Sequence, residues 1–225
     1  MERERDVPSG ATLVAGTLVF VLVMAMHPNA HEILAAADVR RAAGVNLMVH
    51  AVALLGVPVL FLGLLGLWRR LGRGPLATAA LVGWGYASVA VTSAAVTSGF
   101  VASGLMVKLA EAGAPGGTDA AAAHGLLDLA GLAIQGFAKV HLVASSLAIV
   151  LWSVAILRGG ALHRAAGWAG LVAGGGVLVL FFFGGLHLDV HGFGMMVLLQ
   201  AAWLVTVGVL LWRGREPLPA AGTTP

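Results

Sequence analysis

The sequence contains no cysteine and very little charge. Only 10% of its 225 residues are charged, whereas a soluble domain carries about 25%. The absence of cysteine excludes disulfides, thiolate metal sites, Cys-x-x-Cys redox motifs and c-type haem attachment. The formal net charge of +3 is small, so the composition gives no indication of nucleic acid binding. The GxGxxG, Walker, GxSxG and HExxH motifs of soluble enzymes are also missing.

Most of the chain consists of long apolar runs. Hydrophobic residues make up 59% of the chain, and the mean hydropathy is +0.95. The runs have the length of about 20 residues that crosses a hydrocarbon core roughly 30 Å thick. We therefore predict an all-α membrane protein, a six-transmembrane-helix bundle that has the lipid bilayer as its partner. The predicted spans are about 10–26, 46–67, 76–107, 138–157, 165–186 and 194–212.

Polar segments separate and extend these spans. Residues 1–9 form a polar N-terminus, and residues 213–225 form a tail that we expect to be disordered. Pro28 suits the first turn of a helix, which predicts a short amphipathic helix on the outer membrane surface after the first span. The helix of the third span continues to about Ala110, and that of the fourth begins near Ala120. Both helices are longer than a bilayer needs and should project from it.

Basic residues predict the orientation of the chain. Six spans place both termini on one side of the membrane, and nine of the 13 Lys and Arg residues lie in the termini and the two short loops on that side. Cytoplasmic loops carry such an excess of basic residues. We therefore predict that both termini are cytoplasmic and that the membrane is of the bacterial inner-membrane type. The sequence leaves other membrane subunits or a homo-oligomer open as partners.

Histidines gather on the predicted outer side, where seven of the eight lie in the outer segments or near the outer ends of the spans. Two pairs have the i, i+4 spacing that places both side chains on one face of a helix. His50 lies about one turn inside the second span and His141 near the outer boundary of the fourth. A histidine within an apolar span is costly without a partner. The candidate metal ligands are His27, His31, His50, His141, His187 and His191.

Six histidines on one side of the membrane predict a metal or haem site. Neutral imidazole ligates zinc, copper and iron, and two histidines on different helices, such as His50 and His141, could be the axial ligands of a b-type haem. Redox, metal-handling and metal-dependent hydrolase roles all remain open, so the sequence does not decide whether the protein is an enzyme. Possible second-shell partners are Glu32, Asn46, Asp128 and Lys139.

Two other functions compete with a metal site. In a transporter or a quinone-linked membrane subunit, histidine, lysine and aspartate at a wet pocket would carry protons or bind a head group. No acid or base sits at the middle of the membrane, where coupling residues are expected, which counts against this alternative. In an accessory structural subunit the histidines would only form hydrogen bonds, for example between Asn46 and His50.

One face of the third predicted helix carries only small side chains. Small residues let a neighbouring membrane helix approach closely. We interpret this face as a packing surface rather than a ligand groove. Its residues are Ser88, Thr92, Ala95, Gly99 and Ser103.

The membrane zinc hydrolases related to ceramidases and progestin-type receptors combine a His-x3-His pair with separate His and Asp residues. The pair His187 and His191, together with His124 and Asp128, resembles this combination. The resemblance implies a zinc ion held by these side chains. It covers only a few residues. The chain departs from the family in having six predicted spans rather than seven and in placing its pairs at span ends. No activity is carried over on this basis.

Overall fold

The computed structural model describes residues 6–28, 32–33, 38–111, 118–184 and 190–214. Within these residues the chain forms six helical segments that are long and apolar enough to cross a membrane. The prediction of an all-α bundle with six membrane-spanning helices is therefore confirmed. The surface helix expected after the first span falls largely on residues outside the described ranges, and only Glu32 and Ile33 of it are described as helical.

The six segments begin and end close to the predicted spans. The third span is not uniform, because it changes from an α-helix to one π-helical stretch and back. The fourth is a single helix of 42 residues, so the expected polar extension is continuous with the span. The elements are α1 (Val7–Ala25), α3 (Val39–Arg70), α4 (Pro75–Val96), η1 (Thr97–Ala102), α5 (Ser103–Glu111), α6 (Thr118–Gly159), α7 (Arg164–Phe182) and α8 (Val190–Arg213).

Side-chain caps explain why two helices begin earlier than hydropathy predicts. The Asp6 carboxylate accepts a hydrogen bond from the Ser9 backbone N–H at 3.2 Å, and the Asp38 carboxylate accepts one from the Arg41 backbone N–H at 3.0 Å. Such caps satisfy backbone donors that the first turn of a helix leaves free. They start α1 and α3 in polar sequence, several residues before the apolar runs.

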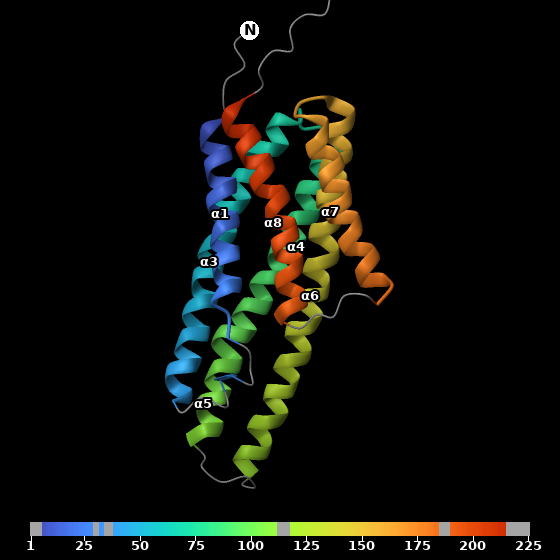
Figure 1. Ribbon diagram of the computed structural model, residues 1–225. Helices are drawn as coiled ribbons and strands as arrows, with labels where there is room; N and C mark the ends of the chain where they lie inside the picture. Colours follow the sequence, from blue (N-terminus) through green and yellow to red (C-terminus); the bar gives the residue numbers. More distant parts are fainter. Residues whose placement is uncertain (1–5, 29–31, 34–37, 112–117, 185–189, 215–225) are drawn as a thin grey trace, which may run out of the picture.

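The helices contact one another in the order of a closed ring. Helix α1 packs on α3 and α8, α3 packs on α4, α4 on α6, α6 on α7, and α7 on α8. The described ends of the chain lie together at one end of the ring, which we call the terminal end. At the opposite, distal end, α5 and the first half of α6 extend beyond the ends of α7 and α8 (Figure 1). The expected projections of the third and fourth helices thus lie at the distal end.

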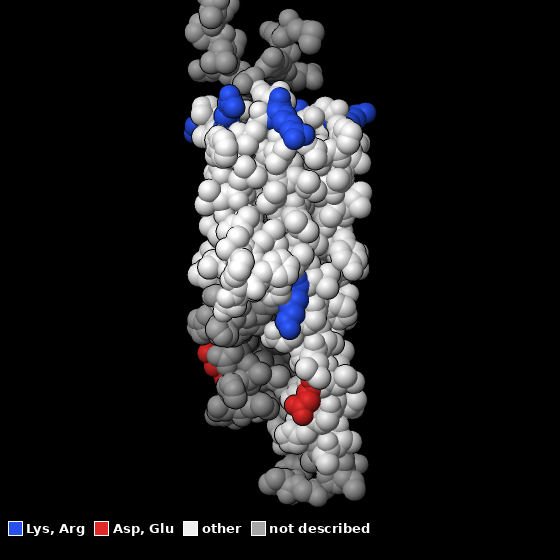
Figure 2. All heavy atoms as spheres, turned by 90° about the vertical axis from the view of Figure 1, so that its right-hand side faces the viewer, with Lys and Arg blue, Asp and Glu red and all other residues white. Residues whose placement is uncertain are grey.

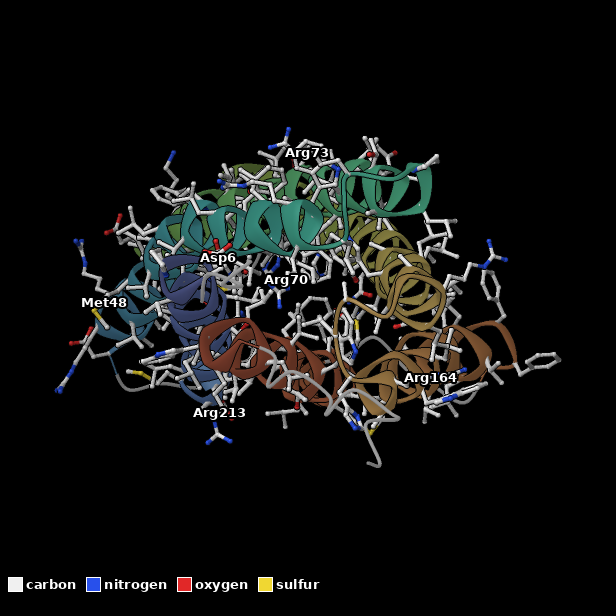
Figure 3. The ribbon with its side chains drawn as sticks, turned by 90° about the horizontal axis from the view of Figure 1, so that it is seen from above. Asp6, Met48, Arg70, Arg73, Arg164 and Arg213 are labelled. Carbon is white, nitrogen blue, oxygen red and sulfur yellow. The ribbon has the colours of Figure 1, made fainter. Side chains whose placement is uncertain are left out.

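Basic side chains collect at the terminal end. Seen from that end, Arg70, Arg73, Arg164 and Arg213 come from α3, the loop after it, α7 and α8 (Figure 3). Figure 2 shows most of the Lys and Arg side chains on its face gathered at the same end. The positive-inside rule associates such a distribution with the cytoplasmic side. The cytoplasmic orientation of the terminal end stays a prediction that rests on this rule.

Indole rings fill the ring of helices in its terminal half. The centroids of Trp84 and Trp152 are 5.8 Å apart, and those of Trp152 and Trp203 are 6.5 Å apart. The Trp203 Nε1 donates a hydrogen bond to the Ala166 carbonyl at 2.8 Å. These rings belong to the largest buried cluster, with leucines from α1, α3 and α8. These side chains pack the interior of the terminal half.

Candidate functional site

A cavity of about 200 Å³ lies inside the ring, and we call it the central cavity. Its wall comes from α1, α3, α4, η1, α6 and α8, but no residue of α7 lines it. The lining runs from His50 to Leu60 on α3 and from Trp84 to Ser98 on α4 and η1. At 1.5 Å of rise per residue these stretches are about 15 Å and about 21 Å long. The cavity is therefore narrow and extends along the bundle axis from the indole rings towards the distal end.

The wall is mainly apolar and carries three of the candidate histidines. His27 follows α1, His50 belongs to α3 and His141 belongs to α6, so three separate parts of the chain each supply one imidazole. Their meeting in one cavity could not be read from sequence, because it depends on the order of helices around the ring.

His27 and His50 are in direct contact. Their Nε2 atoms are 3.2 Å apart, and the rings meet edge to face with centroids 4.8 Å apart. The His50 Nδ1 lies 2.8 Å from the Asn46 carbonyl oxygen, which can only accept, so Nδ1 of His50 carries the hydrogen. In the neutral pair His50 Nε2 is then an acceptor, and the His27 Nε2–H donates to it.

Burial shapes the charge state of this pair. His50 is buried, and His27 is partly buried at the end of α1. Burial lowers the pKa of His27 below its ordinary value of 6.5. The carbonyls of Pro28 and His27 itself and the charge of Glu32 act in the opposite direction, but burial dominates. His27 is therefore held neutral at neutral pH, which agrees with a hydrogen bond between two uncharged rings.

The π-helical stretch η1 fixes His50 from the side. The Asn46 side chain, one turn before His50, donates from Nδ2 to the Ser98 carbonyl at 3.1 Å and to Ser103 Oγ at 2.9 Å. Gly99 lies against His50 so closely that an added Cβ would be 2.5 Å from the His50 Cβ. Single π-helical turns within α-helices occur frequently at functional sites. Here the π-helix holds the third span against the histidine.

His141 repeats the arrangement of His50 on another helix. Its Nδ1 lies 3.0 Å from the Ala87 carbonyl oxygen of α4, so Nδ1 carries the hydrogen and Nε2 is left as an acceptor in the neutral ring. The ring centroid is 5.9 Å from that of Phe193. A backbone carbonyl that fixes the tautomer in this way is typical of imidazoles that present Nε2 to a ligand or a metal.

Sequence reasoning missed several polar residues of the wall. Gln200 is buried and donates from Nε2 to Ser145 Oγ and Ser146 Oγ, each at 3.0 Å. A glutamine in the middle of an apolar span is expensive, and that signal was present in the sequence. Ser88 and Ala95, on the face interpreted as a packing surface, also line the cavity. Gly99 on the same face does pack closely, so the interpretation was right for only part of the face.

The other predicted site residues lie elsewhere or outside the described ranges. His31 and His187 are not described, and His191 is described only as part of the first turn of α8. Lys139, predicted as a possible second-shell partner, is exposed on α6 and does not line the central cavity. The remaining predicted residues, Glu32, Asp128 and His124, are exposed.

The described residues contain no group of three or more His, Asp or Glu side chains placed to hold a metal ion. Comparison of the chain with protein-family models, curated proteins and solved structures found no match. The resemblance to membrane zinc hydrolases therefore gains no support. Since a bundle of this kind can serve many functions, the function has to be argued from the site alone.

Proposed function

We propose that this multi-pass membrane protein binds a lipid-soluble small molecule in the central cavity, with one hydrogen-bonding ring as its head group, as in quinones and quinols. The observation that carries the proposal is the meeting of His27, His50 and His141 in one otherwise apolar cavity. Ligand sites are mostly apolar, with a few polar groups that orient the ligand. We further propose the bacterial inner membrane as the location, with both termini in the cytoplasm.

The size and shape of the cavity support a single ring with a chain. An apolar cavity of about 150 Å³ is enough to hold benzene, so a cavity of about 200 Å³ has room for one substituted ring. The macrocycle of haem b is far larger than that, which makes haem the less suitable ligand. The narrow extension along the bundle axis suits a hydrocarbon tail, since its wall consists of side chains such as Val57, Leu60 and Leu204.

The tautomers of the histidines support a head group that carries hydroxyls. His141 Nε2 is an acceptor in the neutral ring and lines the cavity, so it can accept a hydrogen bond from a hydroxyl. A quinol has two such hydroxyls, whereas a quinone has only carbonyl acceptors. We therefore expect the reduced form to bind more tightly when the histidines are neutral. Imidazole can also take up a proton near neutral pH, so the same side chains suit proton exchange with the head group.

Fluorescence titration with decylubiquinol and decylubiquinone tests the proposal. Trp84 lines the cavity, so a bound ring should quench its emission saturably, and Trp84→Phe should lose most of that quenching. Replacing a buried hydrogen-bonding partner costs about 1–3 kcal/mol. His141→Phe should therefore weaken quinol binding by roughly 5-fold to 150-fold.

His163→Phe is the matched control, because His163 is exposed and caps the start of α7 at the terminal end. The affinity of the His163→Phe variant for decylubiquinol should equal that of the unaltered protein in the same detergent. Quenching that does not saturate, or equal affinities in His141→Phe and His163→Phe, would show that the probe partitions into the micelle rather than into the cavity.

A transition metal held by His27 and His50 is the second candidate. Two nitrogen ligands at 2.0–2.1 Å on a tetrahedral ion are about 3.3 Å apart, and the two Nε2 atoms are 3.2 Å apart. Zinc, copper or iron would suit these ligands. Elemental analysis of the purified protein separates the candidates: metal in stoichiometric amount, lost in His50→Phe but retained in His163→Phe, would favour this site. A Soret band would instead indicate haem.

A further inference from the structure

A second cavity adjoins the central cavity at the distal end of the bundle. It has a volume of about 660 Å³, within the range of about 300–1,000 Å³ that is typical of small-molecule sites. We call it the distal vestibule. Four residues line both cavities and form the boundary between the two: His27, Ser98, Ile134 and Gln135. Asn46 and Asp128 line the vestibule but not the central cavity.

Asn46 leaves one acceptor unused in the wall of the vestibule. The residue is 2% exposed. Its Nδ2 is engaged by the Ser98 carbonyl and Ser103 Oγ, and its Oδ1 is buried without a hydrogen-bond partner. Turning the amide over would place Oδ1 against the Ser98 carbonyl, which cannot donate. The orientation of Asn46 is therefore fixed, and Oδ1 can be satisfied only by a donor from outside the described residues.

His27 leaves a second acceptor unused. Its Nε2–H is donated to His50, so in the neutral ring Nδ1 has a lone pair and no hydrogen. Nδ1 is buried and makes no hydrogen bond of acceptable geometry, although the carbonyls of Pro28 and His27 lie near the ring and cannot donate to it. Buried polar atoms are nearly always paired in native proteins. Two unpaired acceptors on residues that line one cavity point to a ligand that brings hydrogen-bond donors.

The charge and the remaining wall of the vestibule narrow the ligand class. Asp128 is the one acidic residue of the described lining, and that lining includes no lysine or arginine. Much of the rest is hydrocarbon, from side chains such as Ile33, Met106 and Leu127. The described lining has no phenylalanine, tyrosine or tryptophan, so it offers no aromatic cage for a quaternary ammonium ion. A primary ammonium has three N–H donors, which match Asn46 Oδ1, His27 Nδ1 and the Asp128 carboxylate.

We propose that the distal vestibule is a second ligand site, which binds a protonated primary amine with an apolar body. The ammonium group lies at Asn46, His27 and Asp128, and the hydrocarbon part lies against the leucine and isoleucine side chains. This proposal does not rest on the one made for the central cavity. The two ligands share only the boundary residues, so His27 couples the occupancy of one cavity to that of the other.

Binding of benzylamine to the full chain in lipid nanodiscs tests the proposal, with benzyl alcohol and benzoate as uncharged and anionic probes of similar size. Saturation-transfer NMR should detect benzylamine, but not benzoate, on the protein. Asp128 is exposed, so Asp128→Asn should fold normally, and it should weaken benzylamine binding by at least 10-fold. Glu111→Gln is the matched control, because this carboxylate pairs with Arg40 and does not line the vestibule.

Three results would overturn the proposal. Equal binding of benzyl alcohol and benzylamine would mean that the vestibule takes apolar molecules without regard to charge. Unchanged benzylamine affinity in Asp128→Asn would remove the ammonium site. Saturable binding of zinc ions with no binding of benzylamine would make the vestibule a metal site instead. Since decylubiquinol binding is measured separately, failure of the amine site leaves the proposal for the central cavity standing, and the converse also holds.

Discussion

The Nε2 atoms of His27 and His50 lie 3.2 Å apart although 23 residues separate the two histidines in the chain. Because the Asn46 carbonyl takes the hydrogen of His50 Nδ1, the contact has a direction, from the His27 donor to the His50 acceptor. His27 lines both the central cavity and the vestibule, whereas His50 lines only the central cavity. A ligand of the central cavity thus meets both rings, and a ligand of the vestibule meets the His27 ring.

Acid should destabilise the protein through His27. Burial lowers the pKa of its imidazole below the ordinary value of 6.5, so the unfolded chain binds the proton more readily than the folded one. The stability contributed by the neutral ring is complete above pH 6.5 and is lost as the pH falls below 6.5 towards the folded pKa. The melting temperature in detergent should therefore fall over this interval, and less steeply in His27→Gln.

The groups around His27 define the control for this experiment. His50 faces it directly, Glu32 lies near enough to act on its charge, and Asp128 lines the same vestibule. The Glu32 carboxylate favours the protonated ring and so opposes the effect of burial. His163→Gln, at an exposed position, should keep the full acid sensitivity. An equally steep loss in His27→Gln would assign the sensitivity to another group.

Gly99 should be intolerant of even one added carbon. Alanine there would place Cβ 2.5 Å from the His50 Cβ, so α3 and η1 would have to separate. Overpacking of this kind costs about 1–3 kcal/mol, and displacement of His50 should also weaken decylubiquinol binding. Thermal unfolding and the fluorescence titration measure the two effects.

Gly104 provides a matched comparison five residues further along the chain. No atom lies within 4 Å of the Cβ that alanine would add at Gly104. Since alanine is favoured over glycine in a helix by about 0.5–1 kcal/mol, Gly104→Ala should be neutral or slightly stabilising. Equal thermal stability and equal decylubiquinol affinity of the two alanine variants would contradict the close contact between η1 and His50.

The fold followed from the sequence because the bilayer imposes a simple rule. Backbone groups in hydrocarbon must be satisfied within the segment, so an apolar run of sufficient length becomes a helix. The predicted boundaries missed the starts of α1 and α3, where Asp6 and Asp38 cap polar turns that hydropathy cannot register. The π-helix η1 was also not predicted, since it depends on the packing of Asn46 and Gly99 against a neighbouring span.

The candidate site was only partly predictable. His50 and His141 stood out because a polar side chain within an apolar run needs a partner. Helical spacing offered Asn46 as a partner of His50, and the two residues do form a hydrogen bond. The partners on other elements were not predicted: His27 for His50, and a carbonyl of α4 for His141. Which helices are neighbours depends on the ring order, which single-sequence periodicity does not contain. For the same reason the cavity between the helices had no counterpart in the sequence prediction, whereas the polar signal of Gln200 was present in the sequence and was overlooked.

Labelling of single cysteines should establish the predicted orientation. The chain has no cysteine of its own, so each introduced thiol reports alone. Gly74→Cys lies in the loop between α3 and α4 at the terminal end, and Ala122→Cys is exposed in the first half of α6 at the distal end. An impermeant maleimide added to intact cells should label Ala122→Cys and spare Gly74→Cys, with the reverse in inverted vesicles. The opposite pattern would place the termini outside.

The hydrogen-bond geometry assigns opposite tautomers to histidines at the two ends of the bundle. Nδ1 of His50 faces the Asn46 carbonyl and Nδ1 of His141 faces the Ala87 carbonyl, so both rings should carry their hydrogen on Nδ1. His163 accepts a hydrogen bond at Nδ1 from the Ala165 backbone N–H at 3.2 Å, so its neutral ring should carry the hydrogen on Nε2.

Nitrogen-15 chemical shifts of labelled histidine, recorded at a pH above 7, distinguish the two tautomers directly, and His50→Phe, His141→Phe and His163→Phe assign the signals. Two signals of the Nδ1–H type that disappear in His50→Phe and His141→Phe, beside an Nε2–H signal that disappears in His163→Phe, would match the geometry. An Nε2–H form of His50 would reverse the donor in the pair with His27. It would then free the His27 Nε2 as the acceptor and place a hydrogen on His27 Nδ1, which would remove one of the two unpaired acceptors of the vestibule.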